Sequence, residues 1–371
     1  ADLFACFIER CGTLANGRGF FGMITQQAWM FLSSYENLRK KLSLQETVNM
    51  AHLGARAFDE IGGEVVQTTA FVKRQTKISG YKGTYVRLIG INGEQEKSES
   101  FLSGQNRYIA DSDNFAKIPG SPVAYWANAV IKNFSQMPQL KNFVDARIGM
   151  VTGDNDRFFR KWYETIFSDI EFYAEPDKDP KKRKWYPLQK GGEFRRWYGD
   201  TEYVVNWAND GYELKTNLLN GRVKSHNYNG KQQFKRGITW SSISSYAFAC
   251  RYTPAGFTFD AAGPLCEVLN SDKLFNVLGL LNSKVVKYIL DIINPTINFH
   301  PGYLEVLPFS NINDIKIDNI VTKNIAISRE DWDAFETSWD FKRHPLIRKV
   351  DTIEEAFLAW EKECADRFRQ L

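Results

Sequence analysis

Apolar positions near the start of the chain follow a helical period and then a continuous run. The segment 2-DLFACFIERCGTLANG-17 has a helical pattern, and Asn16 with Gly17 would form its C-cap. The apolar run 20–24 predicts a strand covered on both faces, as in a parallel sheet, followed by an amphipathic helix that ends near residue 42. The residues expected on the apolar face of the first helix are Leu3, Phe4, Phe7, Ile8 and Leu14.

Three further strands are predicted before residue 95. They include Thr47–Met50, then 62-GGEVVQTTAFVKR-74 with its β-branched centre, and 84-TYVRLIGI-91, and the last two are expected to be antiparallel neighbours. The order helix, strand, helix, strands is typical of the second half of a mixed α/β sheet. We therefore expect the first half of that sheet to be missing, and we expect the exposed edge to be protected by self-association or local rearrangement.

The remainder of the chain changes character twice. Strand patterns at 202–210 and 237–252 alternate with helical patterns at 123–134 and 271–293. The fold class expected is α/β, with a Rossmann-like half sheet in residues 1–95, an α+β domain in 96–312 and a helical C-terminal segment in 313–371. An apolar stripe in 351–370 is expected to pack within the molecule, and an exposed surface for a partner protein is the alternative.

Composition limits the function classes. The chain has 371 residues, enough for two domains and a tail, and it contains no apolar run of about 18 residues that would cross a membrane. Its five cysteines form no CxxC pair and it has four histidines, so no zinc pattern is recognisable. We expect buried thiols at Cys6 and Cys11, and a reducing, cytoplasmic location. No metal is expected.

Charge is clustered, although the net charge is only +4. Basic residues alternate with aromatic residues at 181-KKRKW-185, 194-FRRWYG-199 and 231-KQQFKRG-237. Lysine and arginine neutralise phosphates, and aromatic rings stack on exposed bases. The alternative is a set of solvated loops in which the arginines pair with nearby acids such as Asp200 and Glu202. Three clusters in one region favour nucleic-acid binding.

Six segments in order carry a family resemblance. The run 2–39 with 52-HLGARAFDEIGGEVVQTTAFV-72 resembles the region after the catalytic loop of amino-adenine DNA methyltransferases. Together with the four segments below, it resembles the PglX adenine-specific methyltransferases of BREX phage-defence systems. Those segments are 149-GMVTGDNDRFFRKWYE-164, 190-KGGEFRRWYGDTEYVVNWANDG-211, 282-NSKVVKYILDIINPTINFHPGYLEVLPF-309 and 330-EDWDAFETSWDF-341.

The resemblance implies S-adenosylmethionine bound at a Gly-rich turn and an adenine held by an Asn-Pro-Pro-Tyr loop. This chain has neither, and its nearest segments are 17-GRG-19 and 294-NPT-296. We therefore expect a C-terminal fragment that binds no cofactor, has no catalytic residues of its own and methylates nothing alone. A complete protein with an unusual N-terminal helix is the alternative. The implied partners are the missing N-terminal half, double-stranded DNA and other proteins of the defence system.

Residues 100–310 would then recognise the DNA target. Three loops are candidates: 151–159, 190–199 and 294–303, the last of which is expected to be stiffened by its two prolines. The alternatives are an Asx turn for the loop 151–159, local ion pairs for the arginines and a structural role for the histidine. Adjacent Arg195 and Arg196 would point to opposite sides of an extended backbone. A non-enzymatic DNA-binding or assembly subunit is the alternative function. The residues predicted to contact DNA are Thr152, Asn155, Arg157, Lys190, Arg195, Arg196, Trp197, Lys235, Arg236, Asn298 and His300.

Overall fold

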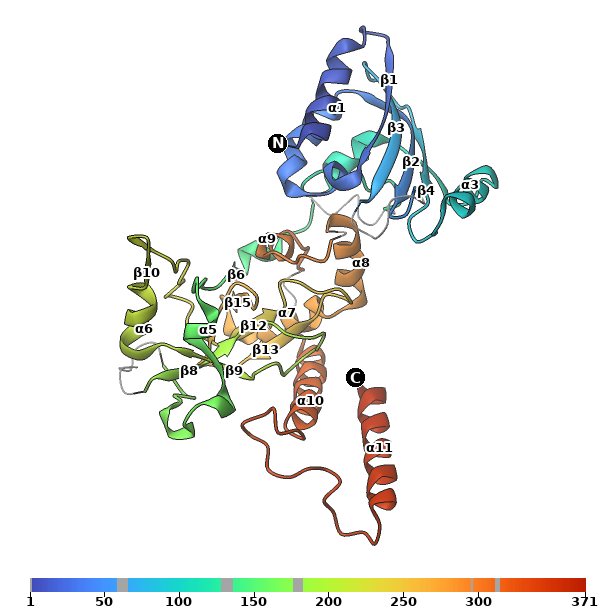
Figure 1. The fold of residues 1–371 in the computed structure, drawn as a ribbon. Coiled ribbons are helices and arrows are strands. Elements are labelled where there is room, and N and C mark those ends of the chain that lie inside the picture. The colour runs from blue at the N-terminus through green and yellow to red at the C-terminus, as the bar shows by residue number, and fades with distance from the viewer. Residues whose placement is uncertain (1, 59–65, 128–135, 176–182, 295, 311–313) are drawn as a thin grey trace. The chain divides into compact units, whose positions relative to one another are not determined.

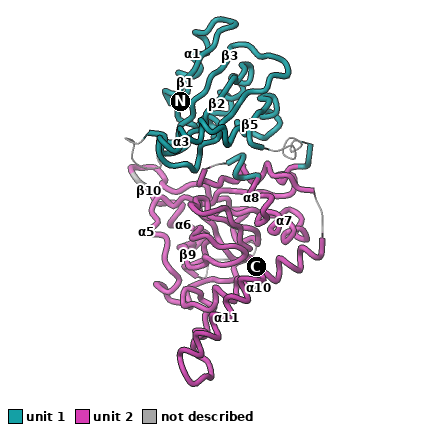
Figure 2. The backbone as a smooth tube through the Cα atoms, turned by 90° about the vertical axis from the view of Figure 1, so that its right-hand side faces the viewer, with its two compact units in different colours: residues 1–138, 289–295 teal, residues 139–288, 296–371 magenta. Residues whose placement is uncertain are grey.

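The protein forms two compact units, which are coloured separately in Figure 2. Unit 1 comprises Ala1–Pro138 and Ile289–Pro295, and unit 2 comprises Gln139–Tyr288 and Thr296–Leu371. The computed structural model describes residues 2–58, 66–127, 136–175, 183–294, 296–310 and 314–371. The expected boundary at residues 95/96 falls inside unit 1, and the assignment of functional domains stays a prediction.

Unit 1 is built on a mixed five-stranded sheet with the order β1-β3-β2-β4-β5 (Figure 1). Strand β2 pairs in parallel with β4, while the other neighbours are antiparallel. The expected pairing of β3 with β4 is therefore wrong, because β2 lies between them. The strands are β1 (Phe20–Gln26), β2 (Glu46–Gly54), β3 (Thr68–Arg74), β4 (Gly83–Arg87) and β5 (Arg107–Ala110), and the helices are α1 (Leu3–Leu14), α2 (Glu36–Leu42) and α3 (Glu94–Leu102).

Strand β1 lies at an edge of this sheet, and one of its two faces is exposed. The expectation of a strand covered on both faces is therefore wrong. Phe20 and Ile24 are each 61% exposed, whereas Phe21 and Met23 pack against the core. A short apolar run does not distinguish a fully buried strand from an edge strand with one apolar outer face. The period of two is present in the structure, but the outer face is not covered by this chain.

Helix α1 has a narrower buried face than its sequence pattern predicts. Ala5, Ile8 and Gly12 are buried, while Leu3 and Phe7 are 75% and 57% exposed. The small residues Ala5 and Gly12 allow the helix to approach the sheet closely, and Ile8 enters the core, whereas Leu3 and Phe7 point away. The thiol of Cys6 is exposed, which contradicts the expected buried position.

The core of unit 1 extends well past residue 95. Tyr125 stacks on Tyr85 with ring centroids 4.8 Å apart, and it also contacts Tyr108 of strand β5. Residues 123–127 have no helical conformation, and the rest of the helix expected at 123–134 lies outside the described residues. The edge strand β5 and the loop after it therefore complete the same core as β1–β4.

Unit 2 contains two four-stranded sheets with the orders β13-β12-β15-β6 and β14-β8-β9-β7, and a small hairpin β10-β11. The strands are β6 (Val144–Arg147), β7 (Phe159–Lys161), β8 (Trp185–Gln189), β9 (Tyr203–Asn206), β10 (Leu218–Leu219), β11 (Arg222–Val223), β12 (Gly237–Trp240), β13 (Cys250–Thr253), β14 (Thr258–Phe259) and β15 (Leu265–Val268). The helices after α3 are α5 (Asn155–Phe158), α6 (Ala208–Lys215), α7 (Leu274–Leu281), α8 (Lys284–Ile293), α9 (Pro301–Glu305), α10 (Ile315–Trp332) and α11 (Ile353–Gln370). This agrees with the expected mixture of strands and helices.

The long helical pattern at 271–293 is divided in the structure. Helix α7 ends before Asn282, and helix α8 begins at Lys284. The Asn282 side chain accepts a hydrogen bond from the Cys250 amide at 2.9 Å and donates one to the Cys250 carbonyl at 3.0 Å. The break between the helices therefore positions the Asn282 side chain, which satisfies the backbone amide and carbonyl of Cys250 in β13.

The two C-terminal helices differ in burial. Helix α10 packs on α7, where Gly279 allows Ile317 and Val321 to approach closely. Among the eighteen residues of α11, only Ala356 is buried, and Ile353 and Phe368 are 80% and 81% exposed. The expected packing of its apolar stripe is therefore wrong for most of the helix. No helix in the described parts of the chain is long and apolar enough to span a membrane.

Candidate nucleic-acid interface

A buried ion pair supports the loop 190–200 in unit 2. Arg251, 1% exposed, lies 2.9 Å from the Asp200 carboxylate. Burial raises the pKa of Asp200, and the positive charge of Arg251 partly opposes that shift. Beside this pair, the Gly192 amide donates to Ser241 Oγ at 3.1 Å, and the Ser241 hydroxyl donates back to the Gly192 carbonyl at 2.9 Å. These contacts fix the base of the loop.

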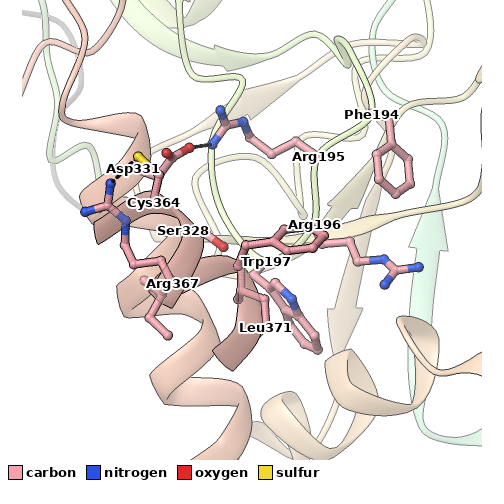
Figure 3. Close-up of a pocket in the computed structure, with 11 residues that line it drawn as sticks. Phe194, Arg195, Arg196, Trp197, Ser328, Asp331, Cys364, Arg367 and Leu371 are labelled. Atoms are coloured by element: carbon pink, nitrogen blue, oxygen red, sulfur yellow. Dashed lines mark hydrogen bonds and ion pairs between the residues drawn. The ribbon is translucent and has the colours of Figure 1, made fainter. Parts of the chain in front are cut away.

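The adjacent residues Arg195 and Arg196 point to opposite sides of this loop, as the alternation of an extended backbone predicts (Figure 3). Arg195 forms an ion pair with Asp331 of α10 at 3.0 Å and lies over the Trp332 ring. Arg196 is exposed, and its guanidinium lies over the Phe194 ring at 5.6 Å. Arg196 is therefore the arginine of this pair that presents its charge to solvent.

Trp197 is held inside unit 2. Its side chain is 9% exposed, its amide donates to the Cys250 carbonyl at 2.9 Å and its carbonyl accepts from the Tyr252 amide at 2.8 Å. An indole in this position cannot stack on a base without leaving the sheet edge. The predicted contact of Trp197 with DNA is untested, but the geometry favours a structural role.

A pocket of about 430 Å³ lies between this loop and helices α10 and α11 (Figure 3). Arg367 of α11 donates to Cys364 Sγ at 3.2 Å and forms an ion pair with Glu330 of α10 at 3.0 Å. The C-terminal helices thus cover the Arg195 side of the loop. Phe194 and Arg196 also line this pocket, and both side chains remain exposed.

A second loop, around Asn298, is joined by hydrogen bonds to segment 240–242, whose Ser241 contacts Gly192 of the first loop. The Phe299 amide donates to the Ser242 carbonyl at 2.8 Å, next to Ser241, and Trp240 Nε1 donates to the Phe299 carbonyl at 2.7 Å. Asn298 and His300 are exposed on this loop. The preceding Pro295, which was expected to stiffen it, lies outside the described residues.

Tyr246 was missed by the sequence analysis. Its ring is 79% exposed and lies 4.7 Å from the Phe194 ring. Segment 241–246 therefore places an aromatic side chain beside Phe194 and joins that loop to the loop of Asn298. Tyr246 belongs to no basic cluster, so composition provided no signal for it.

Another polar depression in unit 2 brings together Asn155 and Lys190. It is also lined by Arg160, Lys161 and Tyr203, and the amines of Lys161 and Lys190 lie 4.3 Å and 5.5 Å from the Tyr203 ring centre. The sequence analysis did not select Arg160 or Lys161. The stretch 159-FRKWY-163 has the same alternation of basic and aromatic residues as the selected clusters, and that signal could have identified them.

Several other predicted contacts have partners within the protein. Thr152 is 1% exposed, and its hydroxyl donates to Asn155 Oδ1 at 2.6 Å. Arg157 binds Glu213 at 2.7 Å, and Lys235 binds Glu267 at 2.7 Å. These contacts favour the structural alternative for the three residues, although DNA binding by them is untested. Arg236 is exposed, and Lys181 and Lys182 of the first basic cluster lie outside the described residues.

One of the two segments nearest to the cofactor and catalytic motifs of the family can be placed in the structure. The segment 17-GRG-19 connects α1 to β1, whereas a Gly-rich cofactor turn connects a strand to a helix. Within the described ranges, no group of three or more His, Cys, Asp or Glu residues is arranged to hold a metal ion. We therefore assign neither a cofactor site nor a metal site, and we derive no catalytic step.

Comparison with known proteins identifies relatives along the whole chain. The family described as Eco57I restriction-modification methylase matches residues 1–56. The adenine-specific methyltransferase PglX of Lacticaseibacillus casei (strain Zhang) is 43% identical over 100% of this chain and 32% of its own length. The adenine-specific methyltransferase BrxX of Escherichia coli O9:H4 (strain HS) is 39% identical over 97% of this chain and 29% of its own length.

Two solved structures share the fold. The type IIL restriction-modification enzyme MmeI, in complex with DNA, has a TM-score of 0.58 at 11% identity and covers 100% of this chain and 50% of its own. A nuclease-deletion mutant of the type ISP enzyme LlaGI, with a DNA substrate mimic, has a TM-score of 0.51 at 12% identity over 88% of this chain and 31% of its own. The chain spans about a third of the length of the curated relatives it matches. As its sequence predicts, the chain is similar over its whole length to a part of the PglX and BrxX adenine-specific methyltransferases.

Proposed function

We propose that this chain is the target-recognition part of a site-specific N6-adenine DNA methyltransferase. The observation that carries the proposal is its similarity, from end to end, to two proteins named adenine-specific methyltransferases. The fold shared with two restriction-modification enzymes that were solved with DNA or a DNA mimic supports it. Unit 1 would be the second half of a Rossmann-like methyltransferase sheet, and unit 2 would read the DNA.

Two groups of side chains in unit 2 would divide this work. Arg196 and Tyr246, with Asn298 and His300 on the connected loop, can donate to base edges or contact the backbone. The second group surrounds the depression at Tyr203, where Lys190 and Arg160 can neutralise phosphates and Asn155 can hydrogen bond, while Lys161 is held by the Glu202 carboxylate. Phosphate contacts would supply affinity, and the side chains on the loops would supply sequence preference.

The methyl donor and the adenine-binding loop would be supplied by another part of the enzyme. S-adenosylmethionine provides the methyl group when it is bound there, and the residues of this chain would hold and orient the DNA duplex. The isolated chain would therefore bind DNA without methylating it. A role in phage defence, with other proteins of the same system, is part of this proposal.

A chimera tests where recognition resides. Residues 139–309 of this chain would replace the aligned segment of the L. casei PglX, and the methylated sequence would be determined by methylation-sensitive sequencing of host DNA. We expect the chimera to methylate a new site, because the loops that would contact bases are exchanged. Methylation of the original site by the chimera would contradict the proposal.

The matched control exchanges residues 1–138 and leaves the proposed recognition unit of the L. casei protein in place. This chimera should keep the original methylation site, because the exchanged segment would contain sheet residues and no base-reading loops. A new site produced by this control would instead place recognition in unit 1.

A further inference from the structure

A cavity of about 270 Å³ lies in unit 1, at the end of the sheet where β2 begins and β3 ends. It is bordered by α2, the first residues of β2, the last residues of β3 and the segment 112–123. Trp29, Met50 and Phe115 form an apolar part of its wall. Drug-sized ligand pockets are about 300–1,000 Å³, so this cavity suits a smaller molecule.

The charged residues of this cavity are all basic. Arg39, Lys40 and Lys73 line it, and none of the described lining residues is acidic. Arg39 and Lys73 are each 4% exposed, whereas Lys40 lies at the rim, where it forms an ion pair with Glu36 at 2.8 Å. Burial of two cations beside one cavity gives it a positive potential in a low-dielectric setting.

Lys73 has a neutral hydrogen-bond partner. Its amine donates to Thr47 Oγ1 at 2.8 Å, and Glu46 acts on it electrostatically from a greater distance. The Glu46 carboxylate itself accepts from the Ser112 hydroxyl and the Ile78 amide, both at 3.2 Å. Buried ammonium groups are normally paired, because an uncompensated charge in the interior is costly. The arrangement leaves the positive end of Lys73 beside an open volume.

We propose that this cavity is a binding site for a small organic anion. The carboxylate or phosphate group of the ligand would lie against Lys73, with Thr47 and Ser121 hydroxyls near it, and the apolar part would lie against Trp29 and Phe115. Nothing in the proposed recognition of DNA uses this cavity, so the site stands independently of that function. Bound anion would also restore the charge balance around the buried lysine.

Isothermal titration calorimetry with phenyl phosphate, benzoate and neutral benzamide tests the site on the full 371-residue chain. We expect at least one anion to bind with a Kd of about 1 mM or tighter and benzamide to bind at least about tenfold more weakly. Tighter binding of phenyl phosphate or of benzoate identifies the phosphate or the carboxylate as the preferred group. Equal binding of benzamide, or no heat from either anion, would overturn the proposal.

Two variants separate a specific site from general positive charge. Lys73→Met removes the buried ammonium but keeps a long apolar chain, and we expect it to weaken anion binding at least about tenfold. Lys41→Met removes the same charge outside the cavity, where Lys41 pairs with Glu9, and should change the affinity by less than about threefold. Thermal unfolding of both variants checks that they are folded. Unchanged anion affinity in folded Lys73→Met would also overturn the proposal.

Proton uptake provides a readout that a void without function would not give. Burial lowers the pKa of Lys73 to about 7, and Lys77 lowers it further, while Glu46 opposes the shift. Arg39 and Lys40 also face the cavity. A bound anion favours the ammonium form, so affinity should fall from about pH 6 to about pH 8. The measured heat at about pH 7.5 should also depend on the ionisation enthalpy of the buffer. An affinity that does not change with pH, together with a heat that does not change with the buffer, would contradict the role of Lys73.

Discussion

At the scale of single residues, His52 illustrates how burial fixes a protonation state. Its ring is 2% exposed, with Nδ1 2.9 Å from the Tyr125 hydroxyl and Nε2 2.7 Å from Gln27 Oε1. A carboxamide oxygen only accepts, so Nε2 carries the proton and Nδ1 accepts from tyrosine. Burial lowers the pKa of His52 to about 3, and the positive charges of Arg87 and Lys97 add to the effect. The native protein therefore keeps this imidazole neutral.

This protonation state predicts a loss of stability in acid. An unfolded histidine has a pKa of about 6.5, so between about pH 6.5 and about pH 3 the unfolded chain binds a proton that the native state excludes. Stability from this group should fall by up to about 1.4 kcal/mol per pH unit as the pH decreases through that range. His52→Gln should remove this part of the slope, and urea unfolding at several pH values measures it. Parallel curves for the two proteins would contradict the neutral buried histidine.

The residue scale also shows what the sequence could not predict. The basic clusters correctly placed Arg196 on an exposed loop, but Arg157, Arg195 and Lys235 have carboxylate partners in the fold. All three partners, Glu213, Asp331 and Glu267, are far from their cations along the chain. Long-range ion pairs depend on how strands and helices meet, and composition gives no signal for them. Tyr246 was missed because it belongs to no basic cluster.

At the scale of elements, strand β1 exposes an apolar edge. Phe20 and Ile24 face outward, and β1 pairs through one side only, with β3. Edge strands of this kind associate with other strands unless a charge or another chain covers them. The sequence predicted the strand itself, because apolar runs are local. The sequence could not predict that one face of β1 is exposed, because packing on that face depends on residues that are distant along the chain.

We expect Ile24→Lys to reduce self-association of this chain. A lysine on the edge strand opposes strand pairing between molecules, while its exposed position leaves the core intact. Sedimentation velocity at several protein concentrations measures the effect. Leu44→Lys is the matched control, since Leu44 is 74% exposed outside the edge strand and the change of charge is the same. Equal association of both variants would show that the β1 edge is not the contact.

At the scale of the whole molecule, two compact units divide the chain at residues 138/139. Most predicted strands and helices are present, since they follow local periodicity. The core of unit 1 extends past residue 95 because β5 and Tyr125 belong to it, and the sequence before residue 140 contains no strong linker signal, while the functional domain boundary expected at 95/96 stays a prediction. The return of residues 289–295 to unit 1 is a long-range feature that periodicity does not encode.

Unit 2 would bind DNA through cations that are not held in short ion pairs, whether they are fully or partly exposed. Lys190 and Arg196 are the proposed contacts, although Lys190 lies 3.8 Å from Asp260 in the free protein. Arg157 and Lys235 provide a matched pair of basic residues, each held by a glutamate at 2.7 Å. Alanine at both members of either pair removes the same charge from the chain.

The most direct measurement is fluorescence anisotropy of labelled duplex DNA at increasing salt for the wild-type chain and the two double alanine variants. Each lost phosphate contact should reduce the slope of log affinity against log salt by about 0.9, so Lys190→Ala with Arg196→Ala should reduce it by about 1.8. Arg157→Ala with Lys235→Ala should leave the slope nearly unchanged. Absence of salt-dependent binding by the wild-type chain, or equal slopes for the two double variants, would contradict the account.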